Sequence, residues 1–165
     1  MGIFRRTAVP DVVKAVALGA GERRVAWALT PDGQAVVAST RALYLPDGTT
    51  LGWDEIERAH WEKPVLWVIE LTEREGSGRR HDIELDLAHD TDLPEAVRTR
   101  VSASFAWSSH VKLQPSGGVR IVGRRRAGME VLDWQLVFDR GTDADDPAMR
   151  AQAEQALAAA RRTIG

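Results

Sequence analysis

The segment Val119 to Phe138 has the sequence VRIVGRRRAGMEVLDWQLVF, in which two apolar runs flank three arginines, an alanine and a glycine. Apolar runs that are separated by a short polar segment with glycine are typical of a β-hairpin. In the second run every other residue is large and apolar, which gives an extended strand one apolar face. These residues are Leu132, Trp134, Leu136 and Phe138. The segment therefore predicts two antiparallel strands with one face directed into a core.

The arginines of this hairpin have two interpretations. In an extended strand Arg120, Arg124 and Arg126 point to the same side. Such a row, with Arg125 beside it, suits the phosphates of nucleic acid or of an anionic lipid headgroup. The alternative is a solvated face whose arginines pair with acids on a neighbouring strand. The matching acidic row is Asp82, Glu84 and Asp86. We expect the second arrangement, because a run of charges usually lies on a solvated face.

Composition excludes several classes of site. The chain has 165 residues, of which 44% are hydrophobic and 28% charged, as in an ordinary globular protein. Its formal net charge of −2 gives no overall attraction to polyanions. It has no cysteine, which excludes disulfides, thiolate metal sites and a cysteine nucleophile, and which fits a reducing cytoplasm. No targeting segment or membrane span is expected, so we predict a cytoplasmic location.

The order of patterns predicts one α+β domain. Residues 1–22 form an N-terminal arm with a short helix near Pro10 to Leu18. Residues 23–165 form the domain itself, divided into 23–106 and a second part, 107–165, of three strands and a C-terminal helix. Strands are expected at 25–29, 34–40, 41–45, 65–71, 82–87, 107–113, 119–125 and 131–139. The strand at 65–71 is apolar on both sides for most of its length, so we place it centrally in its sheet.

Two long helices are expected. The first runs from Asp92, with Glu95 at capping-box spacing, and buries a stripe of residues four apart. The stripe is Leu93, Val97, Val101 and Phe105. In the second, Asp146 caps the helix, Pro147 takes its first position, and a face of small and apolar residues packs on the sheet. This face would also suit a helix contact in a dimer. Residues 50–61, TLGWDEIERAHW, fit two patterns. Trp53, Ile56 and His60 fit a helix, which local propensity favours, whereas Glu57, Ala59 and Trp61 fit one face of a strand.

The tract from Val25 to Thr72 contains Thr40-Arg41-Ala42-Leu43 and Asp54-Glu55-Ile56, and on these residues it resembles a bacterial pleckstrin-homology-like domain. The resemblance implies a strongly curved antiparallel sheet, a partly open barrel with a helix plugging one end. It makes residues 56–61 a strand and makes the Asp92 helix or the C-terminal helix the plug. Members of that family serve as binding modules, scaffolds and dimerising units, usually without catalysis. The tail from Asp139 onward resembles the ends of uncharacterised actinobacterial proteins.

Catalytic and metal sites are not expected. His81-Asp82 and His89-Asp90 bracket a strand, so the histidines lie up to ~26 Å apart and cannot share one metal ion. The acids of the same strand diverge rather than converge on a cation. We therefore predict no catalytic residues, no metal and no cofactor. An enzyme with a site near His81, His89 or His110 is kept as an alternative.

The six tryptophans divide by position. Trp27, Trp67 and Trp134 share faces with aliphatic residues and are expected in the core. A second group, Trp53, Trp61 and Trp107, lies near the ends of elements, where aromatic residues line an interface or pack under a capping helix. We predict a non-catalytic binding or scaffolding domain whose partner is an unknown protein or a second copy. The alternative is a phosphate-binding module that uses the arginine row.

Overall fold

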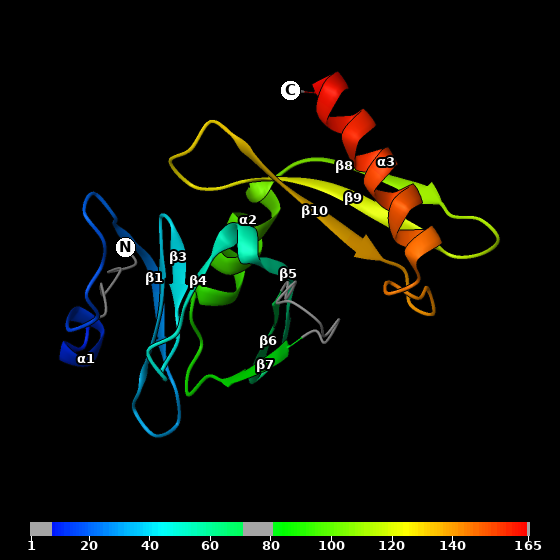
Figure 1. Cartoon of the computed structure of the whole chain (residues 1–165). Helices are drawn as coiled ribbons and strands as arrows, with labels where there is room; N and C mark the ends of the chain where they lie inside the picture. Colours follow the sequence, from blue (N-terminus) through cyan, green and yellow to red (C-terminus); the bar gives the residue numbers. More distant parts are fainter. Residues whose placement is uncertain (1–7, 71–80, 165) are drawn as a thin grey trace, which may run out of the picture.

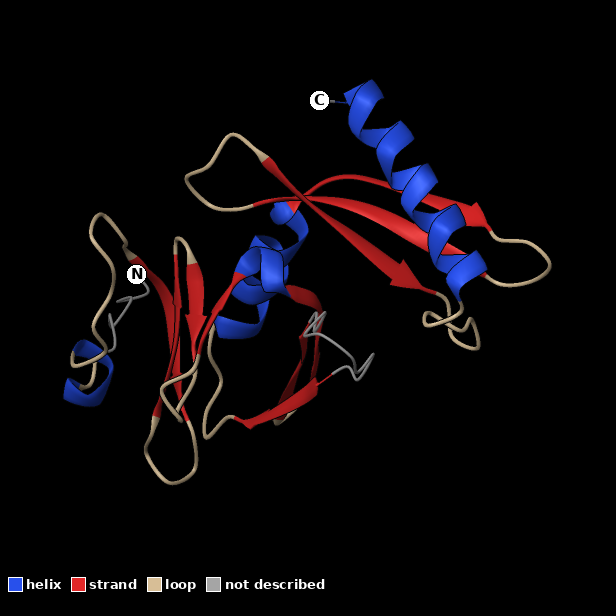
Figure 2. Ribbon diagram, viewed as in Figure 1, coloured by secondary structure: helices blue, strands red, loops and turns tan. Residues whose placement is uncertain are grey.

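The computed structural model describes residues 8–70 and 81–164, which form an α+β structure with three antiparallel sheets (Figures 1 and 2). The first sheet contains β1 (Arg24–Leu29), β2 (Ala35–Ser39), β3 (Ala42–Tyr44) and β4 (Thr50–Gly52), in that order. The second contains β5 (Ile56–Glu62), β6 (Val65–Glu70) and β7 (His81–Asp86). The third has the order β10 (Leu132–Phe138), β9 (Gly118–Arg125) and β8 (Phe105–Lys112). The helices are α1 (Asp11–Lys14), the short 3-10 turn η1 (Trp53–Glu55), α2 (Leu93–Ser104) and α3 (Pro147–Ile164).

One apolar core joins the first two sheets to α2. Ala26, Ala28 and Val36 of the first sheet share this cluster with Leu66 and Val68 of β6, and the predicted stripe of α2 lies among them. The buried members of that stripe are Leu93, Val97 and Val101. Figure 1 shows α2 between the two sheets. This burial explains why α2 is stable, because most helical stability in proteins comes from packing of an apolar face.

A second core lies between the third sheet and α3. The hairpin predicted at 119–138 is present, and Val119, Ile121 and Leu136 point toward the helix. Ala153 and Ala160 are the most buried residues of α3, so the small side chains let the helix lie close to the strands. The cap is also as predicted, since the Met149 amide donates to Asp146 Oδ1 at 2.9 Å.

Several local predictions are confirmed. β6 is the central strand of its sheet, with β5 and β7 on either side. The two Pro-Asp-Gly sequences form turns in which Gly33 and Gly48 have φ of 80° and 87°, a region that glycine enters without steric cost.

Other predictions are wrong. The helix expected over residues 50–61 is absent, because this segment forms β4, η1 and β5 and pairs with neighbouring strands. A single strongly curved sheet is not found in the described parts of the chain, which form three separate sheets. Phe105 does not belong to the α2 stripe, since it begins β8 and is 40% exposed. Asp92 makes no side-chain cap; the Leu93 amide donates instead to Thr91 Oγ1.

The expected pairing of arginines with acids is also wrong. The acidic row Asp82, Glu84 and Asp86 belongs to β7, whose neighbour in the second sheet is β6. β9 lies between β8 and β10 in the third sheet. The two charged rows therefore belong to different sheets and cannot form cross-strand pairs.

Candidate functional site

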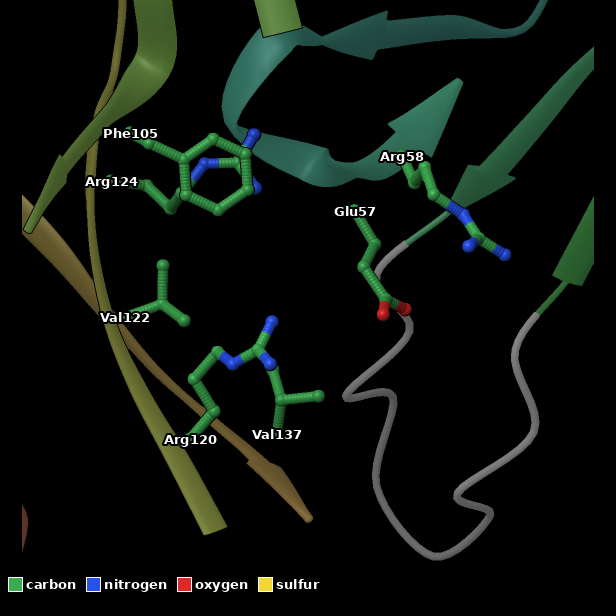
Figure 3. A pocket seen from close by; sticks show the side chains of 7 residues that line it. All are labelled: Glu57, Arg58, Phe105, Arg120, Val122, Arg124 and Val137. Carbon is green, nitrogen blue, oxygen red and sulfur yellow. The ribbon is translucent and has the colours of Figure 1, made fainter. Parts of the chain in front are cut away.

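A pocket of about 220 Å³ lies between β5 and the face of the third sheet that α3 leaves uncovered (Figure 3). Its lining consists of Glu57, Arg58, Phe105, Arg120, Val122, Arg124 and Val137. Alternate residues of β9 reach it because successive side chains of a strand point to opposite faces. The neighbouring strands add the residues that face these positions, since Phe105 of β8 is opposite Arg124 and Val137 of β10 is opposite Arg120.

The wall formed by β5 depends on an irregularity in that strand. The register between β5 and β6 shifts between Ile56 and Arg58, which leaves Glu57 as an additional residue. Such a bulge re-aims side chains that a regular strand would send to opposite faces. The consecutive residues Glu57 and Arg58 therefore both line the pocket.

The side chain of Arg124 is completely buried at one end of the pocket. Its Nη2 donates to the carbonyl oxygens of Trp53 and Ile56, at 2.7 and 2.8 Å, and to the hydroxyl of Ser104 at 2.6 Å. Nε donates to the same hydroxyl at 3.1 Å. The guanidinium carbon lies 3.8 Å from the centre of the Phe105 ring, and Figure 3 shows the two groups stacked. Arg124 thus joins the third sheet to η1, β5 and the end of α2.

The charge of Arg124 is only partly compensated. Burial lowers the pKa of Arg124 to about 10, an effect that the negative charges of Asp54, Glu57 and Asp133 partly oppose. The group therefore stays cationic near neutral pH. All of its hydrogen-bond acceptors are neutral, no carboxylate of the described residues lies within ion-pair distance, and Nη1 has no partner among them. Buried charges in proteins are normally paired, whereas the described residues offer this cation only the more distant charges of Asp54, Glu57 and Asp133.

Arg120 supplies a second cation on the open side of the pocket. It is exposed, and Figure 3 shows its guanidinium reaching in from β9 while the Glu57 carboxylate reaches in from β5. Arg58 lies on the far side of Glu57, and its guanidinium points away from Arg124 and Phe105 (Figure 3). Val122 and Val137 form an apolar floor between the charged groups. The lining thus combines three cations with one carboxylate.

The four arginines proposed from the sequence separate into three environments. Arg120 and Arg124 line the pocket, as their spacing on one strand face predicts. Arg125 is exposed and does not line it. Arg126 Nε donates to Asp54 Oδ2 at 3.2 Å, and this hydrogen bond raises the pKa of Arg126. Because the Asp54 side chain is only 3% exposed, Arg126 neutralises a buried carboxylate and is not free to bind phosphate.

The three tryptophans proposed for an interface also differ. Trp53 is 3% exposed, and its Nε1 donates to the Ser39 carbonyl oxygen. Trp107 contacts Trp134 edge to face within the cluster under α3. Trp61, with 37% of its surface exposed, is the most accessible of the three.

The histidines do not converge. His89 lies edge to face with Trp27, and its Nε2 accepts a hydrogen bond from the Leu29 amide. His110 lies 2.7 Å from Asp139 on the third sheet, and His60 stacks on Trp67. The side chain of His81 is outside the described residues. Within the described chain, no group of three or more histidines and acids is placed to hold a metal ion.

Sequence reasoning missed Glu57, Arg58, Phe105 and Val137. Nothing in the local sequence marks the β5 bulge or the end of α2, and the facing of Val137 and Arg120 follows only from the hairpin register. Once that register is drawn, Val137 can be placed beside Arg120.

No protein-family model, no curated protein and no solved structure matches this chain. None of the helices within residues 8–70 and 81–164 combines the length and hydrophobicity needed to span a bilayer.

Proposed function

We propose that this chain is a non-catalytic binding module whose pocket takes an acidic group, a carboxylate or a phosphate, from a small ligand or from the side chain of a partner. The observation that carries the proposal is Arg124, a fully buried cation bonded only to neutral groups. An acid between Arg120 and the Arg124–Phe105 stack would bring a negative group closer to Arg124 than the described carboxylates do. Hydrogen bonds between ionised groups are about twice as strong as neutral ones, so such a contact would give both affinity and orientation.

The size of the pocket limits the ligand. Its 220 Å³ is below the roughly 300–1,000 Å³ typical of pockets for drug-sized ligands. A single acidic group with a few attached atoms fits this volume. An extended polyanion would instead need several arginines on one accessible face, which the burial of Arg124 and the pairing of Arg126 oppose.

Glu57 sets a preference among acids. Its carboxylate lies on the same pocket and would repel a dianion more than a monoanion. We therefore expect carboxylates to bind at least as well as inorganic phosphate.

The resemblance to pleckstrin-homology-like domains belongs to the same proposal. In residues 23–106 a four-strand sheet is followed by a three-strand sheet and then by α2, which packs on β1, β2 and β5. This order of elements supports the resemblance, although α2 packs against two separate sheets and does not close the end of one curved sheet. Binding without catalysis is the common use of that family.

The test is to titrate the purified chain separately with acetate, glutamate and inorganic phosphate. Heteronuclear NMR records the backbone amide chemical shifts at each ligand concentration. We expect shifts confined to the pocket residues, and an affinity at least tenfold weaker in Arg120→Ala. Arg125→Ala is the matched control, since it removes the same charge from the same strand without touching the pocket. Absence of binding by all three anions, or equal losses in both variants, would refute the proposal.

A further inference from the structure

β8 forms a border of the third sheet, because β9 is its neighbour on one side and the described residues place no strand on the other. The strand is eight residues long and has neither proline nor glycine. No backbone hydrogen bond joins its outer edge to another described segment. Its pairing with β9 shifts between Phe105 and Trp107, so the regular part of the border runs from Trp107 to Lys112. The outward amide and carbonyl groups of this part can pair with another strand.

The side chains of β8 are divided between two environments. Trp107, Ser109 and Val111 are half-buried on the side of α3, whereas Ser108, His110 and Lys112 are exposed on the other side. Trp107 and Val111 belong to the margin of the cluster that α3 covers. Because α3 packs on β9 and β10, the apolar surface of β8 is left incompletely covered. A strand added at this border would cover it.

The sequence of β8 is complementary to itself in one antiparallel register. A twofold axis perpendicular to the sheet keeps α3 of both copies on the same side, so residues of the same face must oppose each other. With the axis at Ser109, Trp107 opposes Val111 of the second copy, and the reverse pair forms by symmetry. On the other face Ser108 opposes His110, and Lys112 lies opposite the irregular start of the second strand. This register matches aromatic with β-branched side chains and brings no like charges together.

Registers shifted by one residue are poorer. An axis at His110 places two histidines opposite each other. An axis at Ser108 places Trp107 opposite Ser109 and so leaves the indole without an apolar partner.

We propose that two copies of this chain associate through β8, which extends the third sheet from three strands to six across a twofold axis at Ser109. The interface is isologous, so each copy contributes the same strand. The pocket lies between the opposite face of this sheet and β5, and β8 contributes Phe105 to its lining. This proposal does not depend on the ligand of the pocket.

The absence of natural cysteine allows a direct test by cross-linking. In Ser109→Cys the two thiols face each other at the axis, and we expect mild oxidation to give a covalent dimer on a non-reducing gel. Ser116→Cys, which places an exposed thiol in the loop after β8, is the control and should stay largely monomeric. Equal cross-linking of the two variants, or none in either, would overturn the proposal.

A charge exchange tests the register independently. Light scattering should show a dimer for the natural chain and monomers for Ser109→Lys and Ser109→Glu, because each variant opposes like charges at the axis. An equimolar mixture of the two variants should form a dimer again, since lysine then faces glutamate. A natural chain that stays monomeric at all concentrations, or charged variants that stay dimeric, would contradict the proposal. Should a charged variant not fold, the nearly isosteric cysteine variant still decides the question.

Discussion

Replacing Arg124 by alanine tests whether a buried cation holds the third sheet to the rest of the chain. The change removes the donors that the carbonyl oxygens of Trp53 and Ile56 accept at 2.7 and 2.8 Å. Ser104 keeps a partner, because its hydroxyl also donates to the Val101 carbonyl oxygen at 2.6 Å. The Ile56 carbonyl therefore loses its side-chain donor, whereas the Trp53 carbonyl keeps a longer hydrogen bond, at 3.3 Å, from the Ser104 hydroxyl. Phe105 loses the guanidinium stacked on its ring.

The magnitude follows from these losses. A buried acceptor left unsatisfied, as at Ile56, costs about 1–3 kcal/mol, and the hydrogen bond lost at Trp53 costs about 1 kcal/mol, so the two carbonyls together cost roughly 2–4 kcal/mol. The contact with the Phe105 ring adds about 1 kcal/mol. Removal of the buried charge returns part of its desolvation cost, which brings the expected net loss to roughly 3 kcal/mol. In a chain of this length that corresponds to a fall in Tm of about 6–12 °C.

The assay is urea unfolding at pH 7, followed by circular dichroism, with the free energy of unfolding compared among variants. Arg124→Lys keeps the charge but loses the planar fork, and we expect a smaller loss than for alanine. Arg125→Ala, one position away and exposed, should change stability by less than about 0.5 kcal/mol. If Arg124→Ala were no more destabilising than Arg125→Ala, the role of Arg124 as a buried connection would be refuted.

Two further predictions concern single side chains. Asp146→Ala removes the cap of α3, in which the Met149 amide donates to Asp146 Oδ1. It should lower the free energy of unfolding, measured in urea, by about 1 kcal/mol. Asp145→Ala is the control, and equal effects of the two changes would exclude a capping role. Burial of the Glu22 carboxyl favours its neutral form, but hydrogen bonds from the hydroxyls of Tyr44 and Ser39 outweigh this and lower the pKa of Glu22. Its stabilising contribution is therefore present above the ordinary glutamate pKa and lost as the pH falls through the lowered pKa. Glu22→Gln should be less stable than the natural chain at pH 7, with a difference that shrinks in acid, and a difference independent of pH would contradict this assignment.

The predictions that succeeded rest on patterns confined to one element. The alternation from Leu132 to Phe138 and the spacing in α3 identify a strand and a helix by their own periodicity. The segment 50–61 failed because its helix propensity was weaker than the hydrogen bonds that β5 makes with β6. The predicted pairing of the acidic row with the arginine row failed for a similar reason. No local signal in the sequence shows that Asp82, Glu84 and Asp86 belong to one sheet and the arginines to another.

Arg124 shows most clearly what a local sequence pattern cannot predict. Its position on the strand face was predicted, but its burial was not, because its acceptors at Ile56 and Trp53 lie 68 and 71 residues away in the sequence. A charge run is usually solvated, and a local pattern cannot reveal that distant carbonyl groups surround one member of it. The pocket is missed with it, because the β5 bulge that completes the lining depends on the pairing of two strands.

The direct passage from α2 to β8 has a consequence for how the molecule tolerates change. The helix ends at Ser104 and the strand begins at Phe105, with no linker between them. One inserted residue here would turn the β8 side chains to the other face of the sheet. Trp107 would then leave the apolar cluster under α3, and Ser108 would enter it. The junction therefore fixes which strand residues face the core relative to the buried face of the helix. We expect insertions and deletions to be tolerated better in the turns after Lys112 and Arg125 than at this junction.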